Sequence, residues 1–452
     1  MHLLRLHNSL TRQLQEFIPI DPNHIKMYVC GPTVYDRPHL GNARSVVIYD
    51  VLYRLLKSQY PKVTYVRNIT DVDDKINKAA KENGETIKAL STRVTGWFHE
   101  DMAALGCLPP TLEPRATENI DAMLRMIEKL IKNGNAYIAA GHVLFDVTSD
   151  AEYGILSGRA AEEQQAGARI AVEGYKKNPG DFVLWKPADN EDDESSKFPS
   201  PWGVGRPGWH IECSAMATKI LGENFDIHGG GADLMFPHHE NEIAQSCSAN
   251  PGSHYAKFWV HNGFLTVNGE KMSKSLGNFI TVKDLLDRGV KGEVIRYALL
   301  SSHYRSPLDW TEKLLEDSKK AMDGFYRVCH PEPREGSGAR RDPSPLAQDD
   351  LVNKLNNDLN ISVFLAEAHE IKNPMVLKQA LNLLGLLQHS PEEWFKGGGK
   401  EDNIEIQNLI NERLTAKKSR DFKKADEIRN KLVSMGIILE DRPDGTTDWR
   451  RV

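Results

Sequence analysis

KMYVCGPTVYDRPHLGN, residues 26–42, is a stretch in which a β-strand pattern ends abruptly at side chains that carry chemistry. Apolar residues alternate with polar or amphipathic ones from Ile25 to Val29, and this alternation predicts a short strand. Cys30 follows directly, and His39 stands just before an apolar helix pattern. A simple turn requires neither a thiol nor an imidazole, so both residues are candidates for function.

The elements after this stretch predict a parallel α/β sheet. Residues 43–57 have an almost wholly apolar helix pattern, residues 62–70 alternate as a second strand, and residues 71–84 have a helix pattern that ends at Gly84. Strands and helices in this order form right-handed parallel units, whose ligands bind at the carboxyl ends of the strands. Cys30 and Thr70 both fall at that edge.

Composition excludes several classes of protein. A chain of 452 residues is too long for one core and predicts two to four domains. The net charge of -6 does not indicate a generally basic nucleic-acid-binding protein, although it allows a local basic face. Five scattered cysteines argue against a disulfide framework. With no signal peptide and no apolar run of membrane length, we expect a cytoplasmic protein without a membrane partner.

Changes in composition and periodicity along the chain indicate where one domain ends and the next begins. The fold expected is α/β, a Rossmann-like parallel-sheet domain with an insertion, followed by a helical bundle and a small C-terminal domain. The expected boundaries are 1–113 for the first half of the Rossmann-like domain, 114–205 for the insertion, 206–281 for the second half, 282–396 for the bundle, with a mobile loop at 330–346, and 402–452 for the last domain.

Four residues could form a metal centre. His238 and Glu242 are four apart on a predicted helix and would share a face, and Cys30 and Cys213 could add two soft ligands. Such pairs are often ordinary helix-surface contacts, and lone cysteines are often buried core residues. The residues alone therefore leave both interpretations open. The other cysteines, Cys107, Cys247 and Cys329, are interpreted as structural.

Two further stretches could contact a nucleotide. Gly229, Gly230 and Gly231 allow close approach of a ligand, or they are only a loop. The sequence KMSKS at 271–275 follows a hairpin signal at Asn268 and Gly269, and its lysines could contact polyphosphate or form a solvated basic turn.

The motifs together resemble class I aminoacyl-tRNA synthetases. HLGN at 39–42 resembles the first signature motif of that class and KMSKS matches the second. MYVCGPTVYD, RPGWHIECSAM, GGGADLMFPHHENE and KMSKSLGNF resemble, more narrowly, the cysteinyl-tRNA synthetase family, and the likeness continues through ALLSSHYRSPLDW into the tail with ADEIR, GIILED and DWRR. Asn42 departs from the motif, which has a histidine there, so a charged role at this position is excluded.

The resemblance implies an ATP-dependent enzyme that joins L-cysteine to tRNA(Cys) through a cysteinyl-adenylate. It implies one Zn²⁺ per chain, which holds the substrate thiolate and is bound by Cys30, Cys213, His238 and Glu242. Gly31, Thr70 and Trp209 would contact the substrate cysteine.

The resemblance also assigns roles toward ATP, which would bind with Mg²⁺. His39, Gly41 and Asn42 would bind ATP and its α-phosphate. Lys271 and Lys274 would neutralise the leaving pyrophosphate, and Gly229, Gly230, Gly231 and Asp233 would lie against adenosine.

The helical region and the tail would bind tRNA, with the domain at 402–452 binding the anticodon. Basic residues at 417–424, together with Arg442, Trp449, Arg450 and Arg451, offer charge and stacking for unstacked bases. A monomer is expected.

Three alternatives remain from the sequence. One is a ligase that joins cysteine to an amino sugar on the same catalytic domain, but its family lacks the full tail. Another is a class I synthetase for a different amino acid, which the cysteine and histidine set disfavours. A third is a zinc protein that only binds RNA, against which the intact HLGN and KMSKS stretches argue.

Overall fold

The computed structural model describes residues 3–158, 174–189, 192–273, 276–329, 345–397, 400–442 and 445–451. Lys274 and most of the loop predicted at 330–346 lie outside the described residues, although Pro345 already begins a helix. Across the described ranges, no helix is both long enough and apolar enough to cross a membrane.

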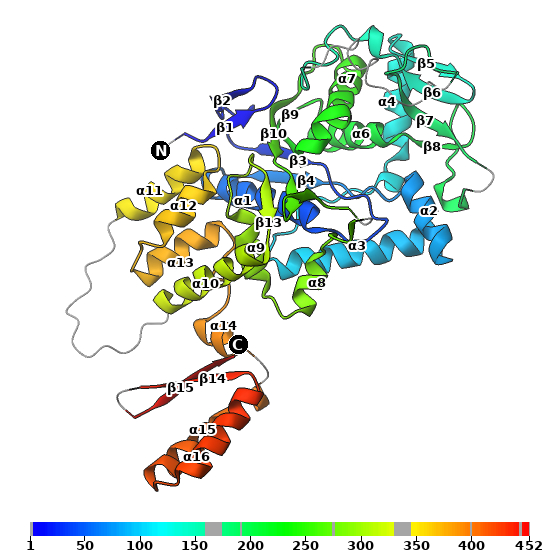
Figure 1. The fold of residues 1–452 in the computed structure, drawn as a ribbon. Helices are drawn as coiled ribbons and strands as arrows, with labels where there is room; N and C mark the ends of the chain where they lie inside the picture. Colours follow the sequence, from blue (N-terminus) through cyan, green and yellow to red (C-terminus); the bar gives the residue numbers. More distant parts are fainter. Residues whose placement is uncertain are drawn as a thin grey trace.

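A four-stranded parallel sheet forms the centre of the molecule (Figure 1). Its strands run in the order β10-β9-β3-β4, with bounds Tyr255–Asn262, Asn224–Gly231, Ile25–Val29 and Val63–Arg67. Both faces are covered, as parallel sheets require. Met27 contacts the apolar core on one face and Tyr28 the core on the other, and both side chains are fully buried.

Helices cover both faces of this sheet. Helix α1, Leu40–Gln59, is buried along most of its length and contacts β4, β9 and the later helix α9. On the other face lie α4 (Ile120–Lys132), α6 (Trp209–Leu221) and α7 (Glu240–Ala249). The α/β fold expected from the sequence is confirmed by this arrangement.

Two local signals near the sheet are also confirmed. Helix α2, Asp74–Asn83, ends at Gly84, which has a φ of +66° and closes the last turn. The predicted hairpin joins β11 (Leu265–Val267) to β12 (Glu270–Lys271) through Asn268 and Gly269, whose φ values are +52° and +81°.

Smaller units surround the central sheet. The inserted region forms an antiparallel sheet in the order β5-β6-β7-β8, at Ala136–Ala139, His142–Phe145, Phe182–Pro187 and Gly205–Pro207. An N-terminal hairpin pairs β1 (Arg5–Asn8) with β2 (Gln13–Glu16). Helix α3 spans Ile87–Ala104.

The second half of the chain is mostly helical (Figure 1). The helices are α8 (Val282–Asp287), α9 (Gly292–Leu300), α10 (Glu312–Cys329), α11 (Pro345–Asn356), α12 (Ile361–Ala368), α13 (Pro374–Leu383) and α14 (Pro391–Lys396). The terminal unit contains α15 (Lys400–Lys418), α16 (Phe422–Ser434) and a hairpin of β14 (Ile437–Asp441) and β15 (Thr447–Arg451).

Three features differ from the sequence-based expectation. Gly229, Gly230 and Gly231 continue strand β9 and do not form a loop after it. Strand β13, Leu308–Trp310, interrupts the region expected to be helical, because it gains β11 as a parallel partner. Trp449 was expected to stack on RNA bases, but it is 4% exposed and forms the core of the terminal unit with Ile406 and Leu432.

Candidate active site

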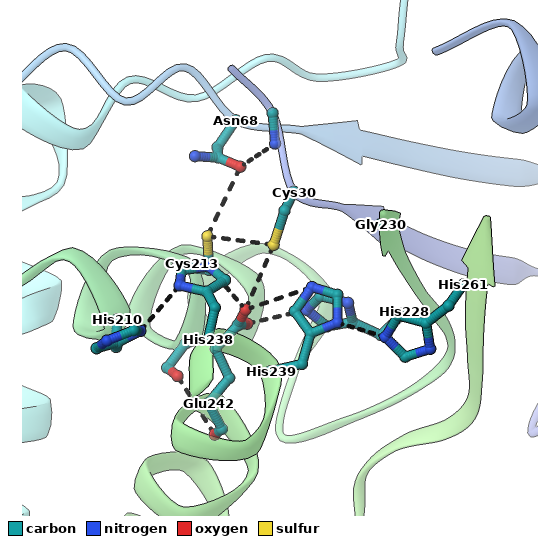
Figure 2. Close-up of polar contacts among 12 residues, drawn as sticks. Cys30, Asn68, His210, Cys213, His228, Gly230, His238, His239, Glu242 and His261 are labelled. Carbon is teal, nitrogen blue, oxygen red and sulfur yellow. Dashed lines mark hydrogen bonds and ion pairs between the residues drawn. The ribbon is translucent and has the colours of Figure 1, made fainter. Parts of the chain in front are cut away.

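Four metal-ligating side chains converge at the carboxyl edge of the sheet (Figure 2). Cys30 follows β3, Cys213 lies on α6, His238 precedes α7, and Glu242 lies in the first turn of α7. Their ligand atoms all lie within 4.8 Å of one another. The two Sγ atoms are 3.6 Å apart, and Glu242 Oε1 lies 3.3 Å from Cys30 Sγ and 3.1 Å from His238 Nε2.

His238 does not lie on a regular helix, contrary to the expectation that it shares one with Glu242. Residues Met235–His239 form a π-helical turn with a cis peptide bond before Pro237, and the α-helix begins at Glu240. His238 and Glu242 nevertheless meet, because the turn leads directly into α7 and keeps both side chains on the side of Cys213.

The charges of this cluster favour a cation at its centre. Burial raises the pKa of Glu242, but His228 and His238 outweigh it and hold that pKa well below its ordinary value. Burial lowers the pKa of His238, but Glu242 and Cys213 raise it to about 10. A hydrogen bond from Cys30 lowers the pKa of Cys213 to about 6, while burial raises that of Cys30. Without a metal, the site therefore retains a proton on His238 as its positive charge.

The donor set fits zinc. Two thiol sulfurs, one imidazole nitrogen and one carboxylate oxygen are all ligand types that this metal takes, and zinc prefers sulfur and nitrogen ligands. Trp209 covers the set, since its ring stacks on His238 with centroids 4.1 Å apart.

Glu242 is held in place by residues that the sequence analysis did not single out. Its second oxygen, Oε2, accepts hydrogen bonds from the buried Tyr255 hydroxyl at 2.9 Å and lies 2.9 Å from His228 Nε2. These contacts leave Oε1 facing Cys30 and His238. Partners of this kind orient a metal ligand and tune its basicity.

More histidines extend the cluster on both sides (Figure 2). His210 Nδ1 lies 2.9 Å from His238 Nδ1, and His239 Nδ1 lies 2.8 Å from His261 Nε2. His239 and His228 also form a second group of possible ligands with Cys30 and Glu242. A histidine within a strand pattern, as His228 is in β9 and His261 in β10, was the available sequence signal for these residues.

The residues predicted to contact the substrate lie around the same edge. Gly31 donates its N–H to Asn68 Oδ1 at 2.8 Å, and a Cβ at Gly31 would lie 1.6 Å from the Asn68 carbonyl oxygen, so only glycine fits. The buried Thr70 hydroxyl donates to Glu212 Oε2 at 2.9 Å. Trp209 is 38% exposed, and its open face is available to a ligand beside the metal set.

His39 and Asn42 cap helix α1 reciprocally. The Asn42 N–H donates to His39 Nδ1 at 3.2 Å, and Asn42 Oδ1 accepts from the His39 N–H at 3.1 Å. Burial lowers the pKa of His39, so its imidazole is neutral near neutral pH. The amide at position 42 thus has a structural role in addition to any contact with ATP.

The HLGN stretch and the second motif are neighbours in space. Leu40 donates its N–H to the Ile280 carbonyl at 3.0 Å, and the His39 ring contacts Phe279 edge-on. A Cβ at Gly41 would lie 3.4 Å from Met272 of KMSKS. Residues about 230 positions apart therefore form one surface, on which Lys271 is exposed.

Close neighbours explain why residues 229–231 are glycines. A Cβ at Gly229 would lie 2.4 Å from the Tyr49 ring, and one at Gly230 would lie 2.8 Å from His239. At Gly231 the close neighbour is the exposed Asp233, which also interacts electrostatically with His39. Asp233 and Gly231 are thus on the HLGN side of the sheet edge.

Comparison with known proteins agrees with this arrangement. The family model of the tRNA synthetases class I (C) catalytic domain matches residues 16–320. A cysteine–tRNA ligase of Ehrlichia ruminantium (strain Welgevonden) is 53% identical over 461 residues and covers 99% of each chain. One of Acidiphilium cryptum (strain JF-5) is 53% identical over 459 residues, with 99% of each chain covered.

Solved structures of more distant proteins share the fold. Mycobacterium tuberculosis methionyl-tRNA synthetase in complex with methionyl-adenylate superimposes with a TM-score of 0.57 at 15% identity, over 80% of this chain and 83% of the other. The agnB2 LeuRS–tRNA–LeuAMS complex of Agrobacterium radiobacter K84 has a TM-score of 0.56 at 11% identity, over 83% and 85%.

Proposed function

The chain belongs to the cysteine–tRNA ligase family of class I tRNA synthetases, and from that premise we propose that it joins L-cysteine to tRNA(Cys) through a cysteinyl-adenylate, with the substrate thiol recognised at a zinc site. The observation that carries the proposal is that ligand atoms of Cys30, Cys213, His238 and Glu242 lie within 4.8 Å of one another at the carboxyl edge of the central sheet. The cytoplasmic, monomeric state expected from the sequence stays a prediction.

Selection of cysteine would depend on the metal set. Bound by these four residues, zinc would supply a position that prefers the sulfur of cysteine over the weakly acidic hydroxyl of serine. A purely apolar pocket distinguishes such near-isosteres by only about 10–200-fold. Trp209 would close the pocket, and Gly31 would lie beside the substrate.

Activation would require the ATP motifs to hold their ligand in line with the substrate carboxylate. His39 and the N-terminal end of α1 would suit the α-phosphate, because the helix dipole favours negative charge there and His39, whose Nδ1 accepts from Asn42, keeps Nε2 as a donor. Lys271 and Lys274 would neutralise pyrophosphate, with Mg²⁺ accompanying ATP. The protein supplies positioning and electrostatic stabilisation and needs no nucleophile of its own.

The test is cysteine-dependent exchange of pyrophosphate into ATP by the purified protein, with zinc content measured alongside. We expect exchange with cysteine, none with serine at the same concentration, and one zinc per chain. Exchange with another amino acid in preference to cysteine would contradict the proposal.

Lys274→Ala tests the role given to the second motif. Loss of one contact made in the transition state costs about 2.7–4 kcal/mol, so exchange should fall about a hundredfold or more while cysteine binding is retained. Lys283→Ala, which removes a neighbouring exposed lysine that pairs with Asp287, is the control. A loss of only a few-fold in Lys274→Ala would show that the loop is not part of the reaction.

A further inference from the structure

Three buried polar side chains form a hydrogen-bonded chain beside the metal set. They are Asn68, which follows β4, Thr70, which comes two residues later, and Glu212 on α6. Each of the three is only 1% exposed. The chain meets the metal set at Cys213, because Asn68 Oδ1 lies 3.7 Å from Cys213 Sγ (Figure 2) and Glu212 directly precedes Cys213 in the sequence.

A backbone donor fixes which way the Asn68 amide faces. The Gly31 N–H donates to Asn68 Oδ1 at 2.8 Å, so the oxygen of the amide lies on that side. The amide nitrogen, Nδ2, then faces Thr70 and donates to its hydroxyl oxygen at 3.3 Å. Because the NH₂ group of an amide has donors only, Thr70 cannot direct its own proton toward Asn68.

The proton of the Thr70 hydroxyl therefore goes to Glu212, whose Oε2 accepts it at 2.9 Å. A hydroxyl group has one proton and two lone pairs. The proton is donated to Glu212 and one lone pair accepts from Asn68, so the second lone pair is what Thr70 can still offer to a ligand. In this arrangement Thr70 is an acceptor only.

An acceptor at this position distinguishes the two polar groups of an amino acid. An ammonium group has donors only, and a carboxylate has acceptors only, so Thr70 can bind the first and not the second. Glu212 Oε1 adds to this preference, because it is buried and has no hydrogen-bond partner among the described residues. A buried carboxylate oxygen without a partner favours a positively charged group beside it.

Space for such a group lies next to Glu212. A cavity of about 340 Å³ is lined by Glu212, by Asp73 and by Trp209, whose ring stacks on the metal-set residue His238. In cysteine the amino nitrogen is three bonds from the sulfur. A substrate whose thiol lies at the metal set would therefore carry its ammonium group only a short way from the sulfur, toward the neighbouring residues.

We propose that Glu212 is a positioning residue, which together with the Asn68 amide orients the Thr70 hydroxyl as an acceptor for the α-ammonium group of the substrate. The proposal rests on the proposed function, because it assumes that the substrate thiol lies at the metal set. It separates recognition of the amino group, through Thr70, from recognition of the thiol.

The experiment compares the binding of two thiols to the zinc-loaded, full-length protein. L-Cysteine and 3-mercaptopropionate share the thiol and the carboxylate and differ in the amino group, and titration calorimetry gives the Kd of each. Glu212→Met removes the acceptor with little change in volume, which frees the Thr70 proton to point at the ammonium group. The Kd for cysteine should rise about tenfold or more, the size of one hydrogen bond to a charged group, and that for 3-mercaptopropionate should change less than about twofold.

Glu212→Gln separates the orientation of Thr70 from the charge of the carboxylate. Its amide carbonyl can still accept from Thr70, so the Kd for cysteine should stay within about threefold of the wild-type value. An equal rise in Glu212→Gln and Glu212→Met would assign the effect to charge and overturn the positioning role. The control is Glu293→Gln, which alters a buried carboxylate on α9 that accepts from the Tyr326 hydroxyl at 2.9 Å, and it should change neither Kd.

Thr70→Val keeps the shape of the side chain and removes the hydroxyl, and it decides the proposal if Glu212→Met loses zinc or does not fold. It should raise the Kd for cysteine about tenfold or more, leave that for 3-mercaptopropionate unchanged, and retain one zinc per chain. Equal weakening of both thiols, or an unchanged Kd for cysteine, would overturn the proposal. Failure of wild-type pyrophosphate exchange would contradict the proposed function instead, and the two Kd values would still be measured because calorimetry needs no ATP.

Discussion

At the scale of single residues, Cys30 links the end of β3 to the metal set. Its Sγ contacts both Cys213 and Glu242. Near neutral pH a serine hydroxyl is neither a soft ligand nor an anion. Replacement by serine therefore removes a metal ligand with little change in volume.

We predict that Cys30→Ser lowers zinc occupancy and raises the KM for cysteine by about a hundredfold or more, since even outer partners of a metal ligand contribute 10–100-fold. The KM for ATP should change little, because the HLGN and KMSKS stretches lie apart from the set. Zinc stoichiometry and exchange kinetics with cysteine and serine measure these effects. Cys247→Ser on α7, outside both ligand groups, is the control. Full zinc with an unchanged KM would make Cys30 a core residue only.

The raised pKa values at the site predict how many protons zinc displaces. At pH 9, Cys30 and His238 should both still be protonated in the metal-free protein, so zinc binding should release about two protons. With the ordinary pKa values, 9.0 for both thiols and 6.5 for His238, zinc binding would release about one proton. Titration calorimetry in buffers of different ionisation enthalpy counts the protons, and Cys30→Ser should release about one fewer.

The same shift gives the metal-free protein a pH-dependent stability. Because the folded pKa of His238, about 10, lies above its ordinary value of 6.5, its contribution is fully present below about pH 6.5 and is lost as the pH rises through about 10. Zinc affinity should rise over that same interval. A release of about one proton at pH 9 would contradict the raised pKa of His238, and with it the expected pH dependence of stability and of zinc affinity.

The sequence alone could indicate which residues have side chains that bind metals, but not that these residues lie close together. Cys30 and Glu242 are more than 200 positions apart, and only the parallel pairing of β3 with β9 brings them together. His228 and Tyr255 escaped notice because they lie on strands that are buried along most of their length, where polar residues show no periodic pattern. The contacts that orient Glu242 are therefore products of the fold.

At the scale of elements, α1 connects the HLGN stretch to the hairpin before KMSKS. The fully buried Arg44 on α1 donates from Nη1 to the Gly263 and Phe264 carbonyls, at 2.9 and 2.5 Å, and from Nη2 to the Ser306 carbonyl and the Ser302 hydroxyl, at 2.7 and 3.0 Å. These acceptors flank β11 and β13. One guanidinium thus fixes the position of α1, which begins within HLGN, relative to the hairpin that leads into KMSKS.

We predict that Arg44→Lys lowers the free energy of unfolding by about 2–4 kcal/mol, because three ammonium donors cannot satisfy the acceptors that the guanidinium reaches. The kcat for pyrophosphate exchange should fall more than the KM for cysteine rises, because the hairpin would be displaced and the metal set would not. Denaturant unfolding and exchange kinetics provide the measurements. Arg54→Lys, which affects an Arg54–Asp50 pair later on α1, should preserve kcat, and an equal loss of kcat there would argue against a specific role for Arg44.

Elements with strong local signals were predictable, and those that depend on distant partners were not. β3, α1, β4 and α2 follow from alternation, apolar runs and a glycine cap. Strand β10 is buried on nearly its whole length and so lacks alternation. β13 has only three residues and depends on β11 for its existence.

At the scale of the whole molecule, the described residues form two large cores and one small one. The large cores lie on the two faces of the central sheet, and the small one is confined to the terminal unit around Ile410, Leu432 and Trp449. The terminal unit is joined to the rest through α14, where Lys396 Nζ lies 3.4 Å from Asp448 and the Lys396 carbonyl accepts from Arg451. None of these contacts reaches the metal set or the HLGN helix.

Deletion of Asp402 to Val452 should therefore separate the two half-reactions. Pyrophosphate exchange should stay within about twofold of the full chain, since both sheet-facing cores remain. Charging of tRNA should fall about a hundredfold or more in kcat/KM, because charge-assisted contacts contribute about 1.5–3 kcal/mol each and several basic residues of the terminal unit would be lost together. Parallel assays on one preparation, with circular dichroism and thermal unfolding to establish that the shortened chain is folded, measure the effect. Loss of exchange in a folded truncated protein would mean that the terminal unit acts on the chemistry itself, and retained charging would show that RNA is recognised by the bundle and the catalytic half without it.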